Sequence, residues 1–474
     1  MAGKAEVEEK VGSERSERKE RILAAELRSE EPGRTVRLLG WVHHVRDLGG
    51  VAFVVLRDRS GIAQVVLEKD AEASLPGAED VIEVVGAVRL ERRAPGGVEV
   101  KAESVTVLAS AAADLPFSLQ APFLGAKATV GLDVRLDHRP FALRHPQAKA
   151  VFRVQSVLAR GFGEFLSRRG FLAAHTPKIV RTGTEGGAAL FKVDYFGQDA
   201  YLAQSPQFFK QMLVGAGFER VWEVGPVFRA EEHDTSRHLN EYTSMDLEMG
   251  FIQGPEDLMD LETELLRYLL DLVDGELASE LATLGATLPA LPPSGRIPRI
   301  DFAEAVRILR RKAKGGPGEE DNPTAEANLA PEGDLEPQED LTPGEERVLG
   351  RIARERHGSD FVFVTGFPAA HRPFYTMPDQ GRPGYTLGFD LLARGMEVTT
   401  GGQRIHDYGA LVASMRVRGL KPEEFGAYLE VFRLGMPPHG GLAIGLERLT
   451  AQFLQLGNIR EATLFPRDRS RLEP

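Results

Sequence analysis

The sequence predicts an α+β protein of at least two domains: a small N-terminal β-barrel and a larger region that combines a sheet with helices. Three observations lead to this fold class. The chain has 474 residues, whereas a single hydrophobic core usually stops growing at about 250–300 residues. Five short runs of alternating apolar and polar residues begin at Thr35. From residue 147 onward, runs with helical spacing of apolar residues alternate with short, strand-like runs.

The predicted barrel occupies residues 21–112. Its runs are TVRLLGWVHHVRDLGG, VAFVVLRDRSG, IAQVVLEKD, VIEVVGAVRLE and GVEVKAESVTVLA, separated by turns rich in Gly and Asp. Five short strands at this spacing are typical of an OB-fold, whose open face commonly binds single-stranded nucleic acid. The pattern alone is equally compatible with another small β-barrel that has a structural role. Residues 1–20 are highly charged and lack aromatic residues, which indicates a disordered tail.

A hinge and a second domain follow the barrel. Residues 113–146 are rich in Pro and Gly and indicate the hinge, so the second domain is 147–474. It opens with a helix, AKAVFRVQSVLARGFGEFLSRRGF, and a strand-like run, FLAAHTPKIV, that contains Pro177. An amphipathic helix is expected at about 254–273, and the last strand-like runs are DFVFVTGFP, GYTLGFDLLARGMEVTTGGQRI and GLAIGLERL. The acidic stretch 315–346 is predicted to be a surface insertion.

The composition narrows the class of protein. With 42% hydrophobic and 27% charged residues, it is that of a soluble globular protein. No run approaches the ~20 apolar residues that cross a bilayer, and the first residues are too acidic for a targeting signal. We therefore expect a cytoplasmic protein with no membrane partner. The chain has no cysteine, so disulfides, catalytic thiols and cysteine-bound zinc are excluded, which favours magnesium as the metal.

The net charge of −12 argues mildly against a nucleic-acid partner, because phosphate binding is normally driven by a basic face. Much of the negative charge, however, lies in the N-terminal tail and in the stretch 315–346. Both segments are predicted to be solvated, away from any binding surface. The charge therefore does not exclude a nucleic-acid partner.

Two segments carry the densest candidate chemistry. The stretch from Phe228 to Met249, FRAEEHDTSRHLNEYTSMDLEM, holds two arginines and two histidines among six carboxylates, between strand-like runs. Such a mixture of charges indicates a segment that binds a polyanionic, metal-bound ligand, and it is less typical of a solvated loop. Downstream, the run from Gly435 to Leu449, GMPPHGGLAIGLERL, combines Arg448 with glycines that let the backbone approach a ligand. The sequence contains no Walker-type P-loop.

These segments resemble motifs two and three of the class II aminoacyl-tRNA synthetases. Their sequences are similar to those of the archaeal-type aspartyl-tRNA synthetases of subclass b. The helix and strand around Pro177 are similar to motif one, which builds the dimer interface in the family. The resemblance covers nearly all of Thr35 to Pro474. It implies an OB-fold anticodon-binding domain, a class II antiparallel β-sheet flanked by helices, and a homodimer. The implied reaction attaches L-aspartate to tRNA through aspartyl-adenylate, with ATP as substrate and Mg2+ as cofactor.

The resemblance also assigns residues to ATP. Arg229 matches the family arginine that holds the α-phosphate and the substrate carboxylate, and a guanidinium suits this task because it grips two oxygens and keeps its charge. Arg448 matches the arginine that lies over the adenine and meets the γ-phosphate. Arg229 and Arg448 are therefore the implied catalytic residues. The implied ATP-binding residues are Arg229, Ala230, Glu231, Arg237, His238, Leu239, Tyr242, Glu397, Gly445, Leu446, Glu447 and Arg448.

The implied magnesium ligands are Glu397 and Thr400, which offer hard oxygen atoms. Archaeal-type relatives commonly have serine at the position of Thr400, so the hydroxyl is kept. The odd spacing of the two residues on a strand requires one backbone adjustment if both are to face one ion. Asp390 on the preceding strand is either a helper of this site or a surface acid.

Aspartate selection requires cations, because a buried carboxylate without a partner is costly. Lys210 and Arg404 match the two cationic residues that bind the β-carboxylate in aspartyl enzymes, and Asp246 is placed to hold Lys210. Glu185 and Gln207 match residues that position the α-amino end and order a lid over the substrate. The implied aspartate-binding residues are Glu185, Gln207, Lys210, Arg229, Asp246, Thr400 and Arg404.

In the barrel, Phe53 and Gln64 match the residues that read the central uracil of the anticodon, although pattern alone leaves core packing open for Phe53. His43 stands where strict relatives tend to carry tryptophan and relaxed relatives histidine. Pro95 stands where strict relatives tend to have lysine and relaxed relatives proline. Both residues favour a non-discriminating enzyme that charges tRNA(Asp) and tRNA(Asn), with an amidotransferase converting the aspartate on tRNA(Asn). The implied anticodon and discrimination residues are His43, Arg46, Phe53, Gln64, Pro95 and Glu99.

Several alternatives remain open. A discriminating aspartyl enzyme and an asparaginyl enzyme are the nearest, although the asparaginyl family lacks the QSPQ-to-lysine run at 204–210. An asparagine synthetase paralogue on the same catalytic fold would not explain the barrel. A pure RNA-binding protein with a dead catalytic domain would not explain five intact residues, namely Arg229, Glu397, Thr400, Arg404 and Arg448.

Overall fold

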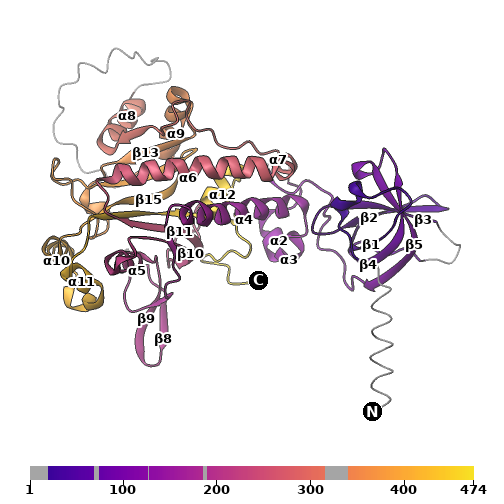
Figure 1. Ribbon diagram of the computed structural model, residues 1–474, viewed down its shortest axis with the longest axis horizontal. Helices are drawn as coiled ribbons and strands as arrows, with labels where there is room; N and C mark the ends of the chain where they lie inside the picture. Colours follow the sequence, from indigo (N-terminus) through magenta and orange to yellow (C-terminus); the bar gives the residue numbers. More distant parts are fainter. Residues whose placement is uncertain (1–19, 69–73, 126–127, 185–188, 315–339) are drawn as a thin grey trace. The chain divides into compact units, whose positions relative to one another are not determined.

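The computed structural model describes residues 20–68, 74–125, 128–184, 189–314 and 340–474 (Figure 1). The chain divides into two compact units, Met1–Ala121 and Pro122–Pro474. The predicted tail up to residue 19 and most of the predicted acidic insertion lie outside the described residues.

The first unit is a closed five-stranded barrel, which confirms the predicted OB-fold. The strands run in the order β1-β2-β3-β5-β4, and β3 and β5 are parallel. Alternate residues of β1, β2 and β4 are buried, and together with residues of β3 and β5 and with Leu27 from a short helix they form the core of this unit. The elements are η1 (Ala24–Ser29), β1 (Thr35–Asp47), β2 (Val51–Arg57), β3 (Ile62–Glu68), β4 (Val81–Leu90), η2 (Pro95–Gly97) and β5 (Val98–Ala109).

The second unit is built on an eight-stranded sheet of order β12-β13-β14-β15-β16-β11-β10-β6. Its neighbours are antiparallel except at the two edges, where β6 pairs with β10 and β12 with β13 in parallel. This is the predicted sheet flanked by helices. The strands are β6 (Leu172–Ala173), β10 (Arg220–Phe228), β11 (Glu241–Gly250), β12 (Arg299–Asp301), β13 (Phe361–Thr365), β14 (Gly388–Ala393), β15 (Met396–Arg404) and β16 (His439–Gly445).

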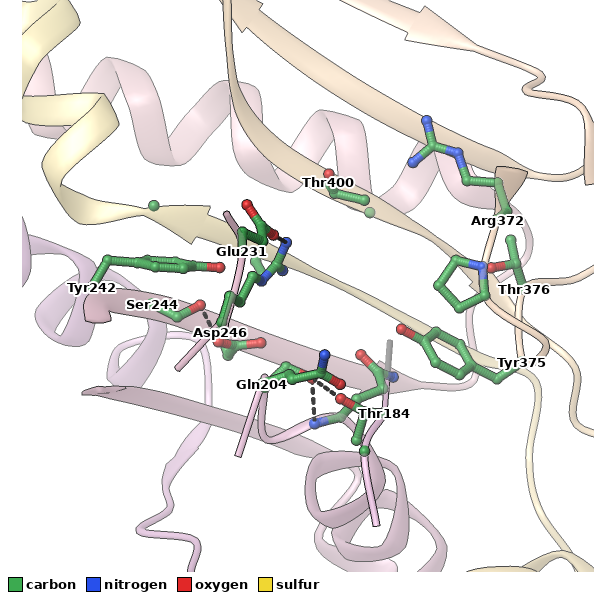
Figure 2. Close-up of a pocket in the computed structure, with 18 of the residues that line it drawn as sticks. Thr184, Gln204, Glu231, Tyr242, Ser244, Asp246, Arg372, Tyr375, Thr376 and Thr400 are labelled. Carbon is green, nitrogen blue, oxygen red and sulfur yellow. Dashed lines mark hydrogen bonds and ion pairs between the residues drawn. The ribbon is translucent and has the colours of Figure 1, made fainter. Parts of the chain in front are cut away.

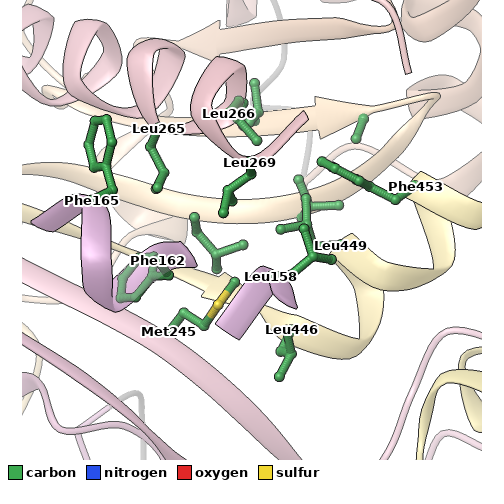
Figure 3. Packing of buried hydrophobic residues seen from close by; sticks show 14 of the residues in the cluster. Leu158, Phe162, Phe165, Met245, Leu265, Leu266, Leu269, Leu446, Leu449 and Phe453 are labelled. Atoms are coloured by element: carbon green, nitrogen blue, oxygen red, sulfur yellow. The ribbon is translucent and has the colours of Figure 1, made fainter. Parts of the chain in front are cut away.

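Helices cover both faces of the sheet. Helices α4 (Pro146–Ser167), α6 (Pro255–Glu276) and α12 (Leu446–Leu454) pack on one face, where their leucines and phenylalanines form the largest core (Figure 3). On the other face, α8 (Phe302–Lys314) and α9 (Pro343–His357) cover the β12–β14 end of the sheet. A third apolar cluster joins α5 (Gln207–Leu213), α10 (Tyr408–Val417) and α11 (Gly426–Arg433). Shorter helices are α2 (Leu132–Asp137), α3 (Arg139–Ala142), η4 (Val214–Phe218), α7 (Ala278–Leu284), η6 (Ala369–His371), η7 (Pro422–Phe425) and η8 (Ile459–Ala462).

Part of the predicted hinge is ordered structure. Residues 132–142 form α2 and α3, and their arginines are buried against the C-terminal segment. Arg135 bonds Glu461 at 3.0 Å, and Arg139 donates to the carbonyl of Leu464 at 2.8 Å. Sequence patterns did not indicate this packing, because its partners lie more than 300 residues downstream.

The strand expected around Pro177 is divided. Leu172–Ala173 forms β6 at the edge of the large sheet, whereas Ile179–Val180 forms β7 in a separate three-stranded sheet of order β7-β9-β8. Proline lacks the backbone N–H that a continuous ladder needs, so the chain leaves one sheet and enters another around it. The other two strands of the small sheet are β8 (Lys192–Tyr195) and β9 (Gln198–Leu202).

The last residues of the acidic stretch that was predicted to be a surface insertion belong to a helix, α9. Thr342 caps α9 and forms a capping box with Glu345, so the helix begins before the predicted end of the insertion. The next residue, Glu346, is only 6% exposed and forms an ion pair with Arg237 of the loop between β10 and β11. The surface assignment is therefore wrong for Glu346.

Candidate active site

A cavity of about 1050 Å³ opens on the face of the sheet opposite to α6 (Figure 2). Strands β11, β15 and β16 form its floor, and α5, the loop after β10 and the loop after η6 contribute walls. Most of the predicted ATP, magnesium and aspartate residues line it, although they come from segments up to about 240 residues apart. These are Gln207, Lys210, Arg229, Glu231, Arg237, His238, Leu239, Tyr242, Asp246, Glu397, Thr400, Arg404, Gly445, Glu447 and Arg448.

Arg229 directly follows β10, and its backbone is fixed by Asn240. The Arg229 N–H donates to the Asn240 carbonyl at 2.8 Å, and the Asn240 side-chain amide donates to the carbonyls of Arg229 and Glu231 at 2.7 and 3.0 Å. The Arg229 guanidinium lies 3.7 Å from Glu231 and 5.7 Å from the ring centre of Tyr242. A cation, an acid and an aromatic ring are thus grouped just after the end of the strand.

The loop between β10 and β11 presents two further candidate phosphate-binding residues. Arg237 forms an ion pair with Glu346, and the Glu346 carboxylate also accepts the backbone N–H of Glu397 at 3.2 Å. His238 Nδ1 lies 2.6 Å from the hydroxyl of Thr235. Burial and the nearby Arg448 lower the pKa of His238, which favours the neutral ring at neutral pH.

Glu397 and Thr400 face the cavity together because β15 contains a β-bulge. Thr399 pairs with Leu391 and Glu397 with Leu392, so Val398 is an extra residue in the ladder. Val398 belongs to the core, which leaves Glu397 and Thr400 on the same side. The Thr400 hydroxyl donates to the Glu397 carboxylate at 2.9 Å. The bulge is the backbone adjustment that the odd spacing required.

Cations surround the Glu397 carboxylate. Burial alone would raise its pKa, but Arg448, the Thr400 hydroxyl, Arg372 and Arg229 outweigh burial and hold the pKa below its usual value. Arg448 lies 3.5 Å from the carboxylate and donates to the Glu397 carbonyl at 3.1 Å. An ionised carboxylate beside a hydroxyl is a donor set that suits Mg2+. No cluster of three or more His, Asp or Glu ligands occurs in the described part of the chain, and Mg2+ commonly uses one or two protein ligands plus phosphates.

Lys210 is a buried cation at the end of the cavity away from Arg448. Its ammonium donates to Asp246 at 3.0 Å and to the carbonyls of Leu247 and Leu442 at 3.3 Å, and it lies 3.3 Å from Glu248. The Ser244 hydroxyl holds the other oxygen of Asp246 at 2.5 Å (Figure 2). The predicted role of Asp246 as the partner of Lys210 matches this geometry.

Arg404 lies beside Lys210 and shares Glu248 with it. The Arg404 Nε donates to Glu248 at 3.1 Å, and one Nη donates to the Gly441 carbonyl at 3.0 Å. Burial would raise the pKa of Glu248, but Arg404 and Lys210 outweigh burial and lower it. Glu248 therefore holds both candidate aspartate-binding cations in fixed positions. Sequence reasoning missed it, although strand alternation places Glu248 on the same face as Asp246.

A buried amide network orients Gln207. The Gln211 carbonyl oxygen accepts from the Gln207 amide at 3.0 Å and from the Tyr428 hydroxyl at 3.1 Å, and the Gln211 amide lies 2.8 Å from His439 Nε2. Burial lowers the pKa of His439 to about 4, and its Nδ1 lies 2.9 Å from the Pro437 carbonyl, so Nε2 is the acceptor. The amide nitrogen of Gln207 is thus engaged, and its oxygen lies 3.5 Å from Arg404.

Asp390 is not a surface acid, and its role as a helper of the candidate magnesium site stays a prediction. It is buried, and Arg372 donates to its two oxygens at 2.9 and 2.5 Å. Burial raises the pKa of Asp390 to about 6, although Arg372 opposes the shift. The pair lies beside Thr400, because Asp390 and Thr400 are opposite each other in the β14–β15 ladder.

Four predicted residues differ from the rest in their placement. Glu185 lies outside the described residues. Ala230 and Leu446 do not line the cavity, and the Leu446 side chain is part of the hydrophobic core under α12. Glu447 is buried and accepts the Thr243 N–H at 3.1 Å, and burial raises its pKa to about 7. Glu447 therefore links the start of α12 to β11 at the wall of the cavity.

The barrel gathers the predicted anticodon residues on one outer face. Phe53 is opposite Arg46 in the β1–β2 ladder, and Gln64 is opposite Glu99 in the β3–β5 ladder. Phe53 alternates with the inward residues of β2 and lies outside the core cluster, so core packing does not explain it. The Gln64 amide donates to Glu99 at 2.9 Å. An aromatic ring beside hydrogen-bonding groups is typical of a base-binding face.

The two predicted discrimination residues lie at the edge of this arrangement. His43 is the extra residue of a bulge in β1, and its Nδ1 lies 2.9 Å from the buried Arg57, which forms an ion pair with Glu79 at 2.7 Å. Pro95 begins the short helix η2 between β4 and β5.

Both units of the chain match known protein families. The family model of tRNA synthetases class II (D, K and N) matches residues 131–469, and that of an OB-fold nucleic acid binding domain matches residues 36–108. The chain belongs to the class II tRNA synthetases. Family members generally use ATP and Mg2+. None of the described helices is long and apolar enough to cross a membrane.

Similar proteins span nearly the whole length of this synthetase. The aspartate–tRNA(Asp/Asn) ligase of Thermus thermophilus is 47% identical over 96% of the chain and 100% of its own length. The aspartate–tRNA(Asp) ligase of Pyrococcus abyssi is 41% identical over 95% of the chain and 99% of its own. The crystal structure of asparaginyl-tRNA synthetase from Pyrococcus horikoshii with asparaginyl-adenylate has a TM-score of 0.83 and 33% identity, covering 96% of this chain and 100% of that one.

Proposed function

We propose that this synthetase activates L-aspartate with ATP and transfers it to tRNA. The observation that carries the proposal is the pair of buried cations, Lys210 and Arg404, which lies in the same cavity as Arg229 and the Glu397–Thr400 pair. Burying a substrate carboxylate in this cavity costs desolvation energy, and pairing with the two fixed cations offsets that cost. The names of relatives such as the Thermus thermophilus ligase support the same substrate.

In the first step, the substrate α-carboxylate attacks the α-phosphorus of ATP. The bond to the β-phosphate oxygen breaks, so aspartyl-adenylate and pyrophosphate form. Arg229 would hold both the α-phosphate and the attacking carboxylate, while Glu231 and Tyr242 receive the adenine. The protein contributes mainly position and charge neutralisation, which suits phosphoryl chemistry that needs no covalent catalyst.

The distal phosphates would lie against the other cations of the cavity. Arg237, His238 and Arg448 approach from the loop after β10 and from α12. Glu397 and Thr400 would hold Mg2+, which neutralises the phosphate oxygens when bound. Their shared orientation on the bulge of β15 supports this assignment.

The second step transfers aspartate to the terminal adenosine of tRNA. The attacking hydroxyl loses its proton as the ester forms and AMP leaves. No side chain stands out as general base in the described part of the cavity, so we propose that the adenylate phosphate takes this proton. The outer face of the barrel, with Phe53 and Gln64, would bind the anticodon.

We propose that the enzyme is non-discriminating and charges both tRNA(Asp) and tRNA(Asn). His43 and Pro95 are the residues that favour the relaxed form. An amidotransferase partner would then convert the aspartate on tRNA(Asn). A strict relative, the Pyrococcus abyssi ligase, is also similar over nearly the full length, so the two forms must be separated by experiment.

A homodimer is part of the proposal. Leu172 on the edge strand β6 and Phe218 are about half exposed, and Phe251 is 67% exposed. Phe218 and Phe251 flank the paired ends of β10 and β11. Exposed apolar side chains gathered at a sheet edge are typical of an interface. Sedimentation of the recombinant protein as a dimer would support this; a stable monomer would exclude it.

The test is charging of purified tRNA(Asp) and tRNA(Asn) with labelled aspartate and, separately, with labelled asparagine. We expect aspartate on both tRNAs. Aspartate on tRNA(Asp) alone would keep the synthetase but overturn the relaxed specificity, and asparagine on tRNA(Asn) would overturn the assignment of Lys210 and Arg404.

The matched variants are His43→Trp and Pro95→Lys, alone and combined. They should lower charging of tRNA(Asn) more than that of tRNA(Asp), while aspartate-dependent pyrophosphate exchange stays unchanged because the barrel takes no part in it. Equal losses on both tRNAs would contradict a role in discrimination.

A further inference from the structure

Glu346 joins two segments of the cavity that the sequence does not connect. It lies in the first turn of α9, where the Thr342 cap fixes the start of the helix. Its carboxylate forms an ion pair with Arg237 and accepts the Glu397 N–H at 3.2 Å through the same oxygen, Oε2. Only 6% of Glu346 is exposed, so these contacts are shielded from solvent.

The contact with Glu397 depends on the local geometry of β15. Strand β16 pairs with β15 only from Thr399 onward, so the Glu397 backbone bonds to side chains instead. Its N–H donates to Glu346, and its carbonyl accepts from Arg448 at 3.1 Å. The bulge therefore places Glu346 beside the segment that carries the candidate magnesium ligands.

The contact with Arg237 fixes a side chain that would otherwise be flexible. Arg237 belongs to the loop between β10 and β11, and arginine has high rotamer freedom when nothing holds it. The Glu346 carboxylate holds the guanidinium next to Glu397 and leaves it in the lining of the cavity. An interaction of this kind preorganises a charged group before its ligand arrives.

We propose that Glu346 is a positioning residue for ATP, which holds Arg237 beside the end of β15 so that the guanidinium meets the distal phosphates. This inference rests on the proposed use of ATP in the cavity. Glu346 itself does not line the cavity, so it acts on ATP through the Arg237 side chain, which does.

The test is a double-mutant cycle with Glu346→Ala, Arg237→Ala and the double variant. The KM values for ATP and for aspartate are measured in aspartate-dependent pyrophosphate exchange, and the Kd of Mg2+-ATP is measured directly by calorimetry. Glu346→Ala should raise both the KM and the Kd for ATP by about 10–100-fold, as is common for residues that orient a ligand-binding group. The KM for aspartate should change little.

Two results separate positioning from a general structural role. The double variant should be no weaker in ATP binding than Arg237→Ala alone, because Glu346 acts through Arg237. Glu346→Gln, which keeps an acceptor for the Glu397 N–H but loses the charge, should bind ATP with intermediate strength. Additive losses in the cycle, or equal increases in both KM values, would overturn the proposal.

Glu355→Ala is the matched control, because Glu355 is an exposed acid on the same helix. It should behave like the unmodified protein. If Glu346→Ala does not fold, Glu346→Gln carries the test. Wild-type protein without aspartate-dependent exchange would contradict the proposed function, whereas normal exchange and normal ATP binding in both Glu346 variants would contradict only the present inference.

Discussion

Lys210 is a buried charge on which we expect both the stability of the fold and the proposed choice of substrate to depend. Its ammonium compensates Asp246 and lies within ion-pair distance of Glu248, and all three side chains are almost fully buried. Removing one partner of such a set leaves an uncompensated charge in the interior, which is far more costly than the net gain from forming the pair. The stability and the specificity of the site are therefore linked at this residue.

We predict that Lys210→Met lowers the free energy of unfolding by about 3–5 kcal/mol, the usual cost of breaking a buried ion pair. It should also lower kcat/KM for aspartate by about 100-fold or more, because truncating one member of a buried charge pair costs about 2–5 kcal/mol in binding. Urea unfolding and pyrophosphate exchange measure the two effects.

The combination of Lys210→Met with Asp246→Asn separates stability from specificity. It should recover much of the lost stability, because one buried anion is removed with the cation, but it should recover no aspartate activation. Lys421→Met, at an exposed lysine, is the control and should change neither quantity. Recovered activity in the combined variant would contradict the role of Lys210 as a substrate-binding cation.

At this scale, the cavity-lining residues were more predictable than the residues that hold them. Arg229, Arg404 and Arg448 stand in stretches that resemble those of the family, and the resemblance assigned their roles. Glu346 was read as part of an acidic insertion, because local charge density cannot distinguish a solvated acid from one that meets Arg237 more than 100 residues away. Pairing partners of this kind are set by tertiary contact, which a single sequence does not encode locally.

The β-bulge in β15 brings the two candidate magnesium ligands, Glu397 and Thr400, to one side of the strand, and α6 supports the strand from its other side. Thr399 points away from the cavity and donates to Glu262 of α6 at 2.6 Å. Glu262 has 0% exposure, and its second oxygen has no hydrogen-bond partner among the described residues. Burial raises the pKa of Glu262 to about 8, with Asp390 adding to the shift and the Thr399 hydroxyl opposing it.

This raised pKa makes the stability depend on pH. Native Glu262 keeps a proton that the unfolded chain releases above its ordinary pKa of 4.5. The native state therefore binds more protons between pH 4.5 and about 8, and the free energy of unfolding falls as pH rises through that window. The loss levels off above the native pKa and is on the order of 4–5 kcal/mol at most.

We predict that Glu262→Gln removes this part of the pH dependence, because an amide cannot ionise and can still accept from Thr399. Urea unfolding at pH 5.5–8.5 should show the variant gaining stability relative to the unmodified protein as pH rises. Glu264→Gln, at an exposed acid on the same helix, is the control and should run parallel to the unmodified protein. Parallel curves for Glu262→Gln would mean that the carboxyl is ionised in the native state.

Elements were predictable where a local rule governs them. The barrel strands followed from alternation, and α6 from helical spacing, because burial of one face dictates both patterns. The bulge at Val398 was expected only as an unspecified adjustment, and the split of the strand around Pro177 was not expected. Both depend on how strands from distant segments pair, so their form was visible only in the folded sheet.

At the scale of the whole molecule, each unit has its own hydrophobic core. The barrel core contains only residues of the first unit, and the three other apolar clusters contain only residues of the second. The complete described cavity also lies in the second unit. Separate cores are the condition for independent folding, so adenylate formation and anticodon binding are expected to be separable.

We predict that residues 122–474, expressed alone, fold cooperatively and keep aspartate-dependent pyrophosphate exchange at a rate near that of the full chain. Charging of tRNA should weaken by about tenfold or more, because stacking of a single base on an aromatic residue contributes about 1–3 kcal/mol. The Phe53→Ala variant of the full chain should show a smaller loss of the same kind. A folded fragment without exchange would show that the barrel supports adenylate formation, and a fragment that charges tRNA normally would remove the barrel from recognition.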